Sequence, residues 1–159
     1  MRLLDTSDYQ PRAAAIYDSL AAEFQLLLPG AVIEHIGSSA IPGAVSKGDL
    51  DVFIGVSADQ FEQAAATIER VGFRLKPETL QTTQLHHFVT DRYPMDVTVQ
   101  LVDLGSEFEF FRTFRDLLNR GQGLRNRYNA VKHGAADLDE EGYRECKTQF
   151  IEETLRAHR

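Results

Sequence analysis

Cysteine is almost absent from this 159-residue sequence, which contains Cys146 and no other. A single thiol cannot form a disulfide within the chain, so a disulfide-stapled fold is not expected. No apolar run approaches the roughly 20 residues that a membrane-spanning helix needs, and the first residues lack the basic and apolar regions of an export signal. These absences predict a cytoplasmic protein without a membrane partner.

Positive charge is also in short supply. The chain has 17 Lys and Arg residues against 24 Asp and Glu residues, a formal net charge of -7 at pH 7. Broad nucleic-acid binding is not expected, because it depends on many Lys and Arg contacts to phosphates. Small nucleotides remain compatible with this charge. Several basic residues are concentrated after the last expected strand, where Arg112 and Arg115 would share one face of a helix.

Length and element order predict a single α+β domain over residues 1–159. A hydrophobic content of 43% is sufficient for one well-buried core. Because the strands come early and the helices late, we expect a small mixed β-sheet with helices packed on one side. The apolar patterns predict strands at about 31–36, 50–56, 73–75, 85–90 and 95–102, and helices at about 11–28, 57–72, 107–119, 124–134 and 139–157.

Local signals predict how three of these helices begin. Pro11 suits the opening turn of the first helix, where its missing N–H is no loss. Ser57 with Gln60, and Ser106 with Glu109, have the spacing of a capping box. We therefore expect both serine side chains to cap the helices that follow them.

The most informative segment lies within residues 35–56. It joins a turn at Gly37-Ser38 to an apolar strand that bears Asp49 and Asp51. Residues two apart on a strand point to the same face, so these two carboxylates project together. They repel each other unless a cation lies between them. Mg²⁺ or Mn²⁺ would solve this problem and would keep positions open for the oxygens of a nucleoside triphosphate.

The turn before the acidic strand is the expected phosphate-binding element. Gly37 allows a phosphate to approach the backbone, and Ser38 and Ser39 add hydroxyl groups. Lys47, two residues before the first carboxylate, is either a phosphate ligand or a charge that offsets the acidic pair when no metal is bound. The structural alternative for the segment is an edge strand that begins in a polar turn.

Gly-Ser, ten residues and then Asp-x-Asp followed by apolar residues resemble the nucleotidyltransferase signature of the polymerase β-like superfamily. Within that superfamily, H-I-G-S-S-A-I-P-G at residues 35–43 resembles the GrpB family. The family's pattern recurs at residues 105–119, at Tyr128 with Lys132, and at residues 143–151, so the resemblance covers nearly the whole chain. It implies transfer of a nucleotidyl group from a nucleoside triphosphate to a small-molecule or other acceptor.

The same resemblance implies roles for individual residues. Asp49 and Asp51 would hold the metal that binds the triphosphate. A third carboxylate is expected on a neighbouring strand, where Asp96 has apolar neighbours; it would serve a second ion or activate the acceptor hydroxyl. The alternative for Asp96 is an ordinary turn residue. Lys132, placed by the family pattern, and Arg115 are the expected basic contacts to the triphosphate or to an anionic acceptor.

Two features leave other functions open. The GrpB pattern usually has a single Asp at the position of Asp51, and a His-rich strand where this chain has residues 97–100. His86 and His87 would face opposite sides of a strand, so only one can join a given site, and zinc-ligand spacing is absent. A non-catalytic nucleotide- or coenzyme-binding module and, less favoured, a metal-dependent phosphohydrolase are the alternatives to a transferase.

Overall fold

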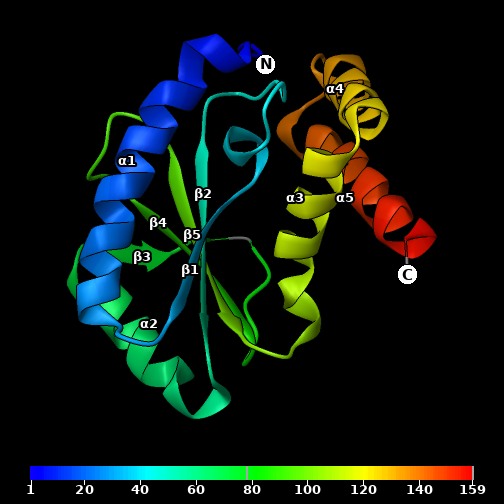
Figure 1. Ribbon diagram of the computed structural model, residues 1–159. Coiled ribbons are helices and arrows are strands. Elements are labelled where there is room, and N and C mark those ends of the chain that lie inside the picture. Colours follow the sequence, from blue (N-terminus) through cyan, green and yellow to red (C-terminus); the bar gives the residue numbers. More distant parts are fainter. Residues whose placement is uncertain (78, 159) are drawn as a thin grey trace.

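A five-stranded mixed sheet with the strand order β1-β2-β5-β4-β3 forms the centre of the computed structural model, which describes residues 1–77 and 79–158 (Figure 1). β2 and β5 are parallel, and the other neighbouring pairs are antiparallel. The prediction of an α+β domain with a small mixed sheet is thus confirmed. The strands are β1 (Val32–Ile36), β2 (Leu50–Val56), β3 (Phe73–Leu75), β4 (Leu85–Thr90) and β5 (Val97–Asp103).

Helices lie on both sides of this sheet (Figure 1). α1 (Thr6–Leu27) and α2 (Phe61–Arg70) pack on one face, as expected from the sequence. The C-terminal helices lie on the other side of the sheet, a second helical layer that the element order did not indicate. They are α3 (Phe110–Arg120), α4 (Gln122–Ala135) and α5 (Glu140–Ala157). No helix in the described part of the chain is long and apolar enough to cross a membrane.

The alternation along β2 gives the two faces of the sheet different chemistry. Leu50, Val52 and Ile54 are fully buried in the main core beneath α1 and α2. The residues between them, Asp51 and Phe53, point to the opposite face, because side chains on a strand alternate. The face beneath the C-terminal helices is therefore the one that bears a carboxylate.

A second apolar cluster joins the segment after β1 to the C-terminal helices. Ile41 and Ala44 of that segment are 1% exposed and pack with side chains of α3 and α4. The ring of Tyr128 from α4 contacts the ring of Phe114 edge-on, with centroids 5.3 Å apart, and stacks on the ring of Phe150 at 5.2 Å. These contacts hold the turn that follows β1 against a rigid helical layer.

The first helix begins at Thr6 and not near Pro11, so Pro11 lies inside it. The extra turn is stabilised by tertiary contacts that outweigh the poor fit of an internal proline. The Tyr9 hydroxyl donates to the Ala44 carbonyl at 2.9 Å, and Gln10 donates to the carbonyl of Ile41 at 2.8 Å.

The two expected capping boxes have different outcomes. The Ser57 hydroxyl donates to the carboxylate of Asp59 at 2.6 Å and caps no backbone N–H, so this prediction is wrong. A 3₁₀ turn at residues 58–60 separates Ser57 from α2. Ser106 does cap, because its hydroxyl accepts from the N–H of Phe108 at 3.3 Å. The Glu109 carboxylate accepts from the N–H preceding Ser106, on residue 105, at 2.8 Å.

Candidate functional site

Gly37 brings the turn after β1 directly onto the carboxylate of Asp51. The φ angle of Gly37 is 73°, a conformation that residues with a side chain rarely adopt. A β-carbon at this position would lie 2.4 Å from Oδ2 of Asp51. The glycine is therefore required by both the backbone and the close approach. The turn and the acidic strand, which the sequence separates, are in contact in the structure.

Asp51 is half-buried next to a second negative charge. Burial, followed by the charge of Asp49, raises the pKa of Asp51 to about 7. Nε2 of Gln100 lies 3.4 Å from Oδ1 of Asp51, and the Ser46 hydroxyl donates to Oδ1 of Asp49 at 2.8 Å. These two donors each bind one carboxylate oxygen of the pair, but both donors are uncharged and neither neutralises the negative charge. The arrangement favours a bound cation.

Lys132 reaches the same turn from α4. Its side chain is 1% exposed, and Nζ donates to the Ser38 hydroxyl at 2.9 Å and to the Val45 carbonyl. Nζ also lies 4.2 Å from the ring centroid of Tyr128. Burial, and then the charge of Lys147, lowers the pKa of Lys132 to about 7. Because it binds both ends of the segment from Ser38 to Val45, Lys132 fixes the shape of this loop.

Two amides from distant helices complete the support of the loop. Nε2 of Gln10 in α1 donates to the carbonyls of Ser38 and Ile41, at 3.2 and 2.8 Å. Nδ2 of Asn129 in α4 donates to the Gly43 carbonyl at 2.8 Å. Neither amide could be predicted from the sequence, because side chains that meet through tertiary packing have no shared local pattern.

Lys147 in α5 is a further residue that the candidate list missed. It is half-buried, with Nζ 5.3 Å from the ring centroid of Tyr143. The positive charge of Lys147 lowers the pKa of both Asp51 and Lys132. The spacing of four residues between Tyr143 and Lys147, which places both on one helix face, was the signal that could have identified it.

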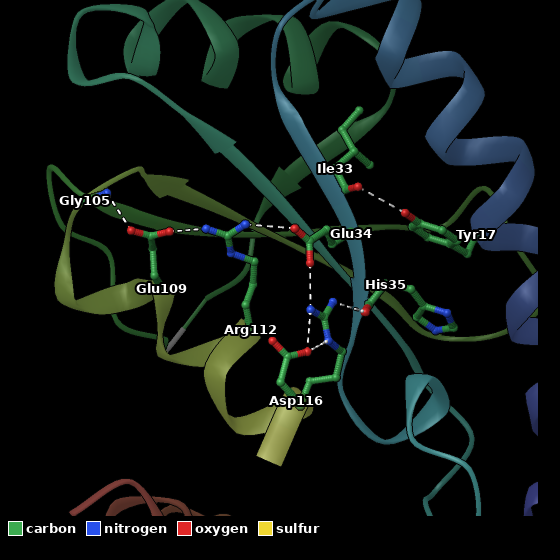
Figure 2. Close-up of polar contacts among 9 residues, drawn as sticks. Tyr17, Ile33, Glu34, His35, Gly105, Glu109, Arg112 and Asp116 are labelled. Atoms are coloured by element: carbon green, nitrogen blue, oxygen red, sulfur yellow. Dashed lines mark hydrogen bonds and ion pairs between the residues drawn. The ribbon is translucent and has the colours of Figure 1, made fainter. Parts of the chain in front are cut away.

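Arg115 and Ser39 are two of the residues expected to bind phosphate. In the structure, the polar atoms of both side chains bind other groups of the protein. The Arg115 guanidinium pairs with Glu34 at 2.7 Å and with Asp116 at 2.9 Å, and it donates to the His35 carbonyl at 2.9 Å. Figure 2 labels these three partners. These bonds attach α3 to β1. Oγ of Ser39, a buried residue, lies 2.7 Å from Nε2 of His35.

Asp96 stands apart from the other two candidate carboxylates. It is exposed and immediately precedes β5, which begins at Val97 and not at the predicted Met95. Together with Lys47, which is also exposed, it lines a separate cleft. Within residues 1–77 and 79–158, no group of three or more His, Cys, Asp or Glu side chains could hold a metal ion. Asp49 and Asp51, two of the three predicted metal ligands, are close enough for the charge of Asp49 to raise the pKa of Asp51.

The adjacent histidines of β4 face opposite sides of the sheet, as predicted. The His86 ring contacts the ring of Phe61 edge-on at 5.0 Å, on the side of α2. The His87 ring contacts the ring of Phe111 edge-on at 6.2 Å, on the side of the carboxylate pair. Burial, followed by the charge of Lys76, lowers the pKa of His87 to about 4, so this ring is neutral at pH 7.

Solved structures show which class of fold this arrangement belongs to. The chain is similar to a cytoplasmic RNA terminal U-transferase, with a TM-score of 0.59 and 18% identity over 81% of this chain and 40% of that protein. It is also similar to the Cid1 poly(U) polymerase with Mg 3′-dATP bound, with a TM-score of 0.57 and 18% identity over 80% of this chain and 41% of that one. The fold is nucleotidyltransferase-like.

Sequence relatives define the family within this class. The family model described as GrpB protein matches residues 4–157. A UPF0157 protein of Vibrio cholerae serotype O1 is 41% identical over 155 residues, which cover 98% of this chain and 82% of that protein. The crystal structure of the conserved protein GrpB from Enterococcus faecalis has a TM-score of 0.69 and 17% identity over 97% of this chain and 99% of that one. The chain belongs to the GrpB family, which confirms the family resemblance seen in its motifs.

Proposed function

We propose that this chain is a metal-dependent nucleotidyltransferase that moves a nucleotidyl group from a nucleoside triphosphate to a small-molecule acceptor. The contact between Gly37 and Asp51 is the observation that carries the proposal. The contact supports the proposal because the turn expected to bind phosphate lies beside the carboxylate expected to hold the cation. The nucleotidyltransferase-like fold supports the same function.

The carboxylate pair fits Mg²⁺ or Mn²⁺ held jointly with a nucleotide. Mg²⁺ is usually bound through one or two carboxylates plus the phosphates of a substrate, so Asp49 and Asp51 suffice for one such ion. The raised pKa of Asp51 agrees with a site whose negative charge lacks compensation. When bound, the ion would polarise the phosphoryl oxygens and offset the charge that develops on them.

The protein's own contribution is to bind and orient the triphosphate. The Ser38 hydroxyl accepts from Lys132, and in the bound complex it would donate its own proton to a phosphate oxygen. Lys147 lies close enough to Asp51 to lower its pKa and supplies positive charge on the side of α5. In the transfer, the acceptor oxygen would bond to the α-phosphorus and lose its proton to water. The bond between the α-phosphorus and the oxygen that bridges to the β-phosphate would break, and pyrophosphate would leave with the electron pair. Positioning and charge compensation account for most of the acceleration in such reactions.

Release of pyrophosphate tests this proposal. The chain is incubated with Mg²⁺, each common nucleoside triphosphate and pooled small-molecule acceptors, and pyrophosphate is measured. We expect release that depends on the acceptor pool and that falls by at least about 100-fold in Asp51→Asn. Asp59→Asn is the matched control, because Asp59 is exposed beyond the other end of β2 and carries the same charge. Binding of Mg²⁺ and nucleotide without any pyrophosphate release would favour a non-catalytic nucleotide- or coenzyme-binding module.

A further inference from the structure

A buried serine, Ser46, lies three residues before Asp49, and its backbone pairs with a distant part of the chain. The N–H of Leu4 donates to the Ser46 carbonyl at 2.6 Å, and the N–H of Ser46 donates to the Leu4 carbonyl at 3.2 Å, in an antiparallel bridge. Cδ1 of Leu4 lies 3.0 Å from where a β-carbon on Gly48 would be. The segment before α1 thus packs closely against the segment before β2.

The residue before this serine is held from a third direction. The N–H of Val45 donates to Oδ1 of Asn129 at 3.0 Å, and the Val45 carbonyl accepts from Nζ of Lys132. Both partners belong to α4. The backbone of Ser46 is therefore fixed by the bridge to Leu4 and by the attachment of its neighbour to α4, so tertiary contacts determine where its hydroxyl lies.

That hydroxyl binds one of the two carboxylates of the site. Oγ of Ser46 donates to Oδ1 of Asp49 at 2.8 Å and accepts from the N–H of Gly48 at 3.1 Å. Asp49 precedes β2 and is outside the pairing of β2 with its neighbours, so the sheet does not fix it. Among the residues that the structure describes, no other hydrogen bond or ion pair reaches the Asp49 carboxylate.

We propose that Ser46 is a positioning residue, which holds the Asp49 carboxylate in the orientation that binds a divalent cation. The inference rests on the proposed function, because it concerns the same cation. Carboxylates that bind metal ions are usually hydrogen-bonded by neighbouring groups, which orient them. Since the serine occupies Oδ1, Oδ2 of Asp49 is the oxygen left for the ion. The rigid backbone around Ser46 lowers the loss of side-chain freedom when the ion binds.

Binding of Mn²⁺ tests this role without any need for turnover. Electron paramagnetic resonance measures the free ion while Mn²⁺ is titrated into the full chain with a non-hydrolysable ATP analogue. Ser46→Ala removes the hydroxyl and keeps the backbone bridge to Leu4, so the Kd for Mn²⁺ should rise about tenfold or more. Ser46→Thr retains a hydroxyl, and its Kd should stay within about threefold of the wild-type value.

Ser57→Ala is the matched control. The Ser57 hydroxyl also donates to a carboxylate, that of Asp59 at 2.6 Å, but at an exposed position outside the site. The Kd of this variant for Mn²⁺ should equal that of the wild type. Urea denaturation checks that each variant is folded during the titration. If Ser46→Ala is not folded, Ser46→Cys takes its place with the same expected rise in Kd, because a thiol is only a weak donor.

The wild-type titration separates this inference from the proposed function. If the wild type binds Mn²⁺ with the analogue and Ser46→Ala binds it equally well, the positioning role is overturned and the proposed function stands. Equal losses in Ser46→Ala and Ser46→Thr would also overturn the role, because the hydroxyl would then not be the group that matters. If the wild type binds neither Mn²⁺ nor the analogue, the proposed function fails, and the role of Ser46 toward the cation fails with it.

Discussion

Gly37 and Asp51 are in direct contact, since a β-carbon on residue 37 would lie 2.4 Å from Oδ2 of Asp51. Gly37 directly follows β1, and Asp51 belongs to β2, the strand that pairs antiparallel with β1. Their contact sets the position of the loop relative to the carboxylate pair. The loop expected to bind phosphate therefore lies directly against the side chain expected to bind the cation.

Replacement of Gly37 by alanine is expected to be more costly than the same change at another strained glycine. Gly43 has a φ of 84° and nothing within 4 Å of its β-carbon position, so Gly43→Ala should lose about 1 kcal/mol of unfolding free energy from backbone strain alone. Gly37→Ala adds the clash with Asp51 and should lose about 3 kcal/mol or more. Urea denaturation compares the two variants. Equal losses would contradict the contact.

Asp51→Asn is expected to stabilise the protein when no divalent cation is present. The pKa of Asp51 is raised from 3.8 to about 7, so between these values the native state holds a proton that the unfolded chain releases. The stability from this group is present below about pH 4 and is lost as the pH rises through 7. At pH 8 with a chelator, the variant should gain about 1–3 kcal/mol in urea denaturation, and it should gain less at pH 5. A variant that is less stable than the wild type at pH 8 would contradict this account.

Lys132 is expected to make stability increase with pH above neutrality. Its pKa is lowered from 10.5 to about 7, so over this range the unfolded chain holds a proton that the native state lacks. The stability from this group is present above pH 10.5 and is lost as the pH falls through 7. Between pH 7 and 9 the wild type should therefore gain up to about 2 kcal/mol relative to Lys132→Met. Lys47→Met, which removes an exposed lysine, serves as control and should keep the wild-type slope.

His35 is expected to contribute to acid sensitivity. Burial, and then the charge of Arg115, lowers the pKa of His35 from 6.5 to about 4. The unfolded chain thus takes up a proton between these values that the native state does not, and stability is lost as the pH falls from 6.5 to 4. His35→Phe keeps the stack on Tyr17, whose ring centroid is 4.8 Å away, and should lose less stability over this range than the wild type. Circular dichroism during urea titrations at pH 6.5 and 4.5 measures the difference, and equal losses would show that His35 titrates normally.

The contiguous part of the site could be predicted because its signals are local. Strand alternation predicts that residues 49 and 51 share a face, although Asp49 immediately precedes β2, and the Gly-Ser turn is recognisable from two adjacent residues. The resemblance to the GrpB family predicted Lys132 as a further residue of the site. The structure places this lysine on the loop itself, where it binds Ser38 and Val45, a contact that a sequence pattern cannot specify.

The non-local part of the site could not be predicted in the same way. Gln10 supports the loop from a helical turn that lies before Pro11, whereas the sequence predicts that the helix begins near Pro11, because proline suits an opening turn. Arg115 has the charge expected of a phosphate ligand, but its contacts depend on the packing of α3 against Glu34. The direction in which the Asp96 side chain points depends on the residue at which β5 begins. The sequence defines that residue poorly, because β5 follows a turn.

Calorimetric titration of ATP in the presence and absence of Mg²⁺, with the wild type, Asp51→Asn and the control Asp59→Asn, is the most direct measurement of the proposed site. We expect binding that requires Mg²⁺, is lost in Asp51→Asn and is retained in Asp59→Asn. Absence of ATP binding under both conditions, tested with the other nucleoside triphosphates as well, or binding that is equally strong without Mg²⁺ and in Asp51→Asn, would contradict it.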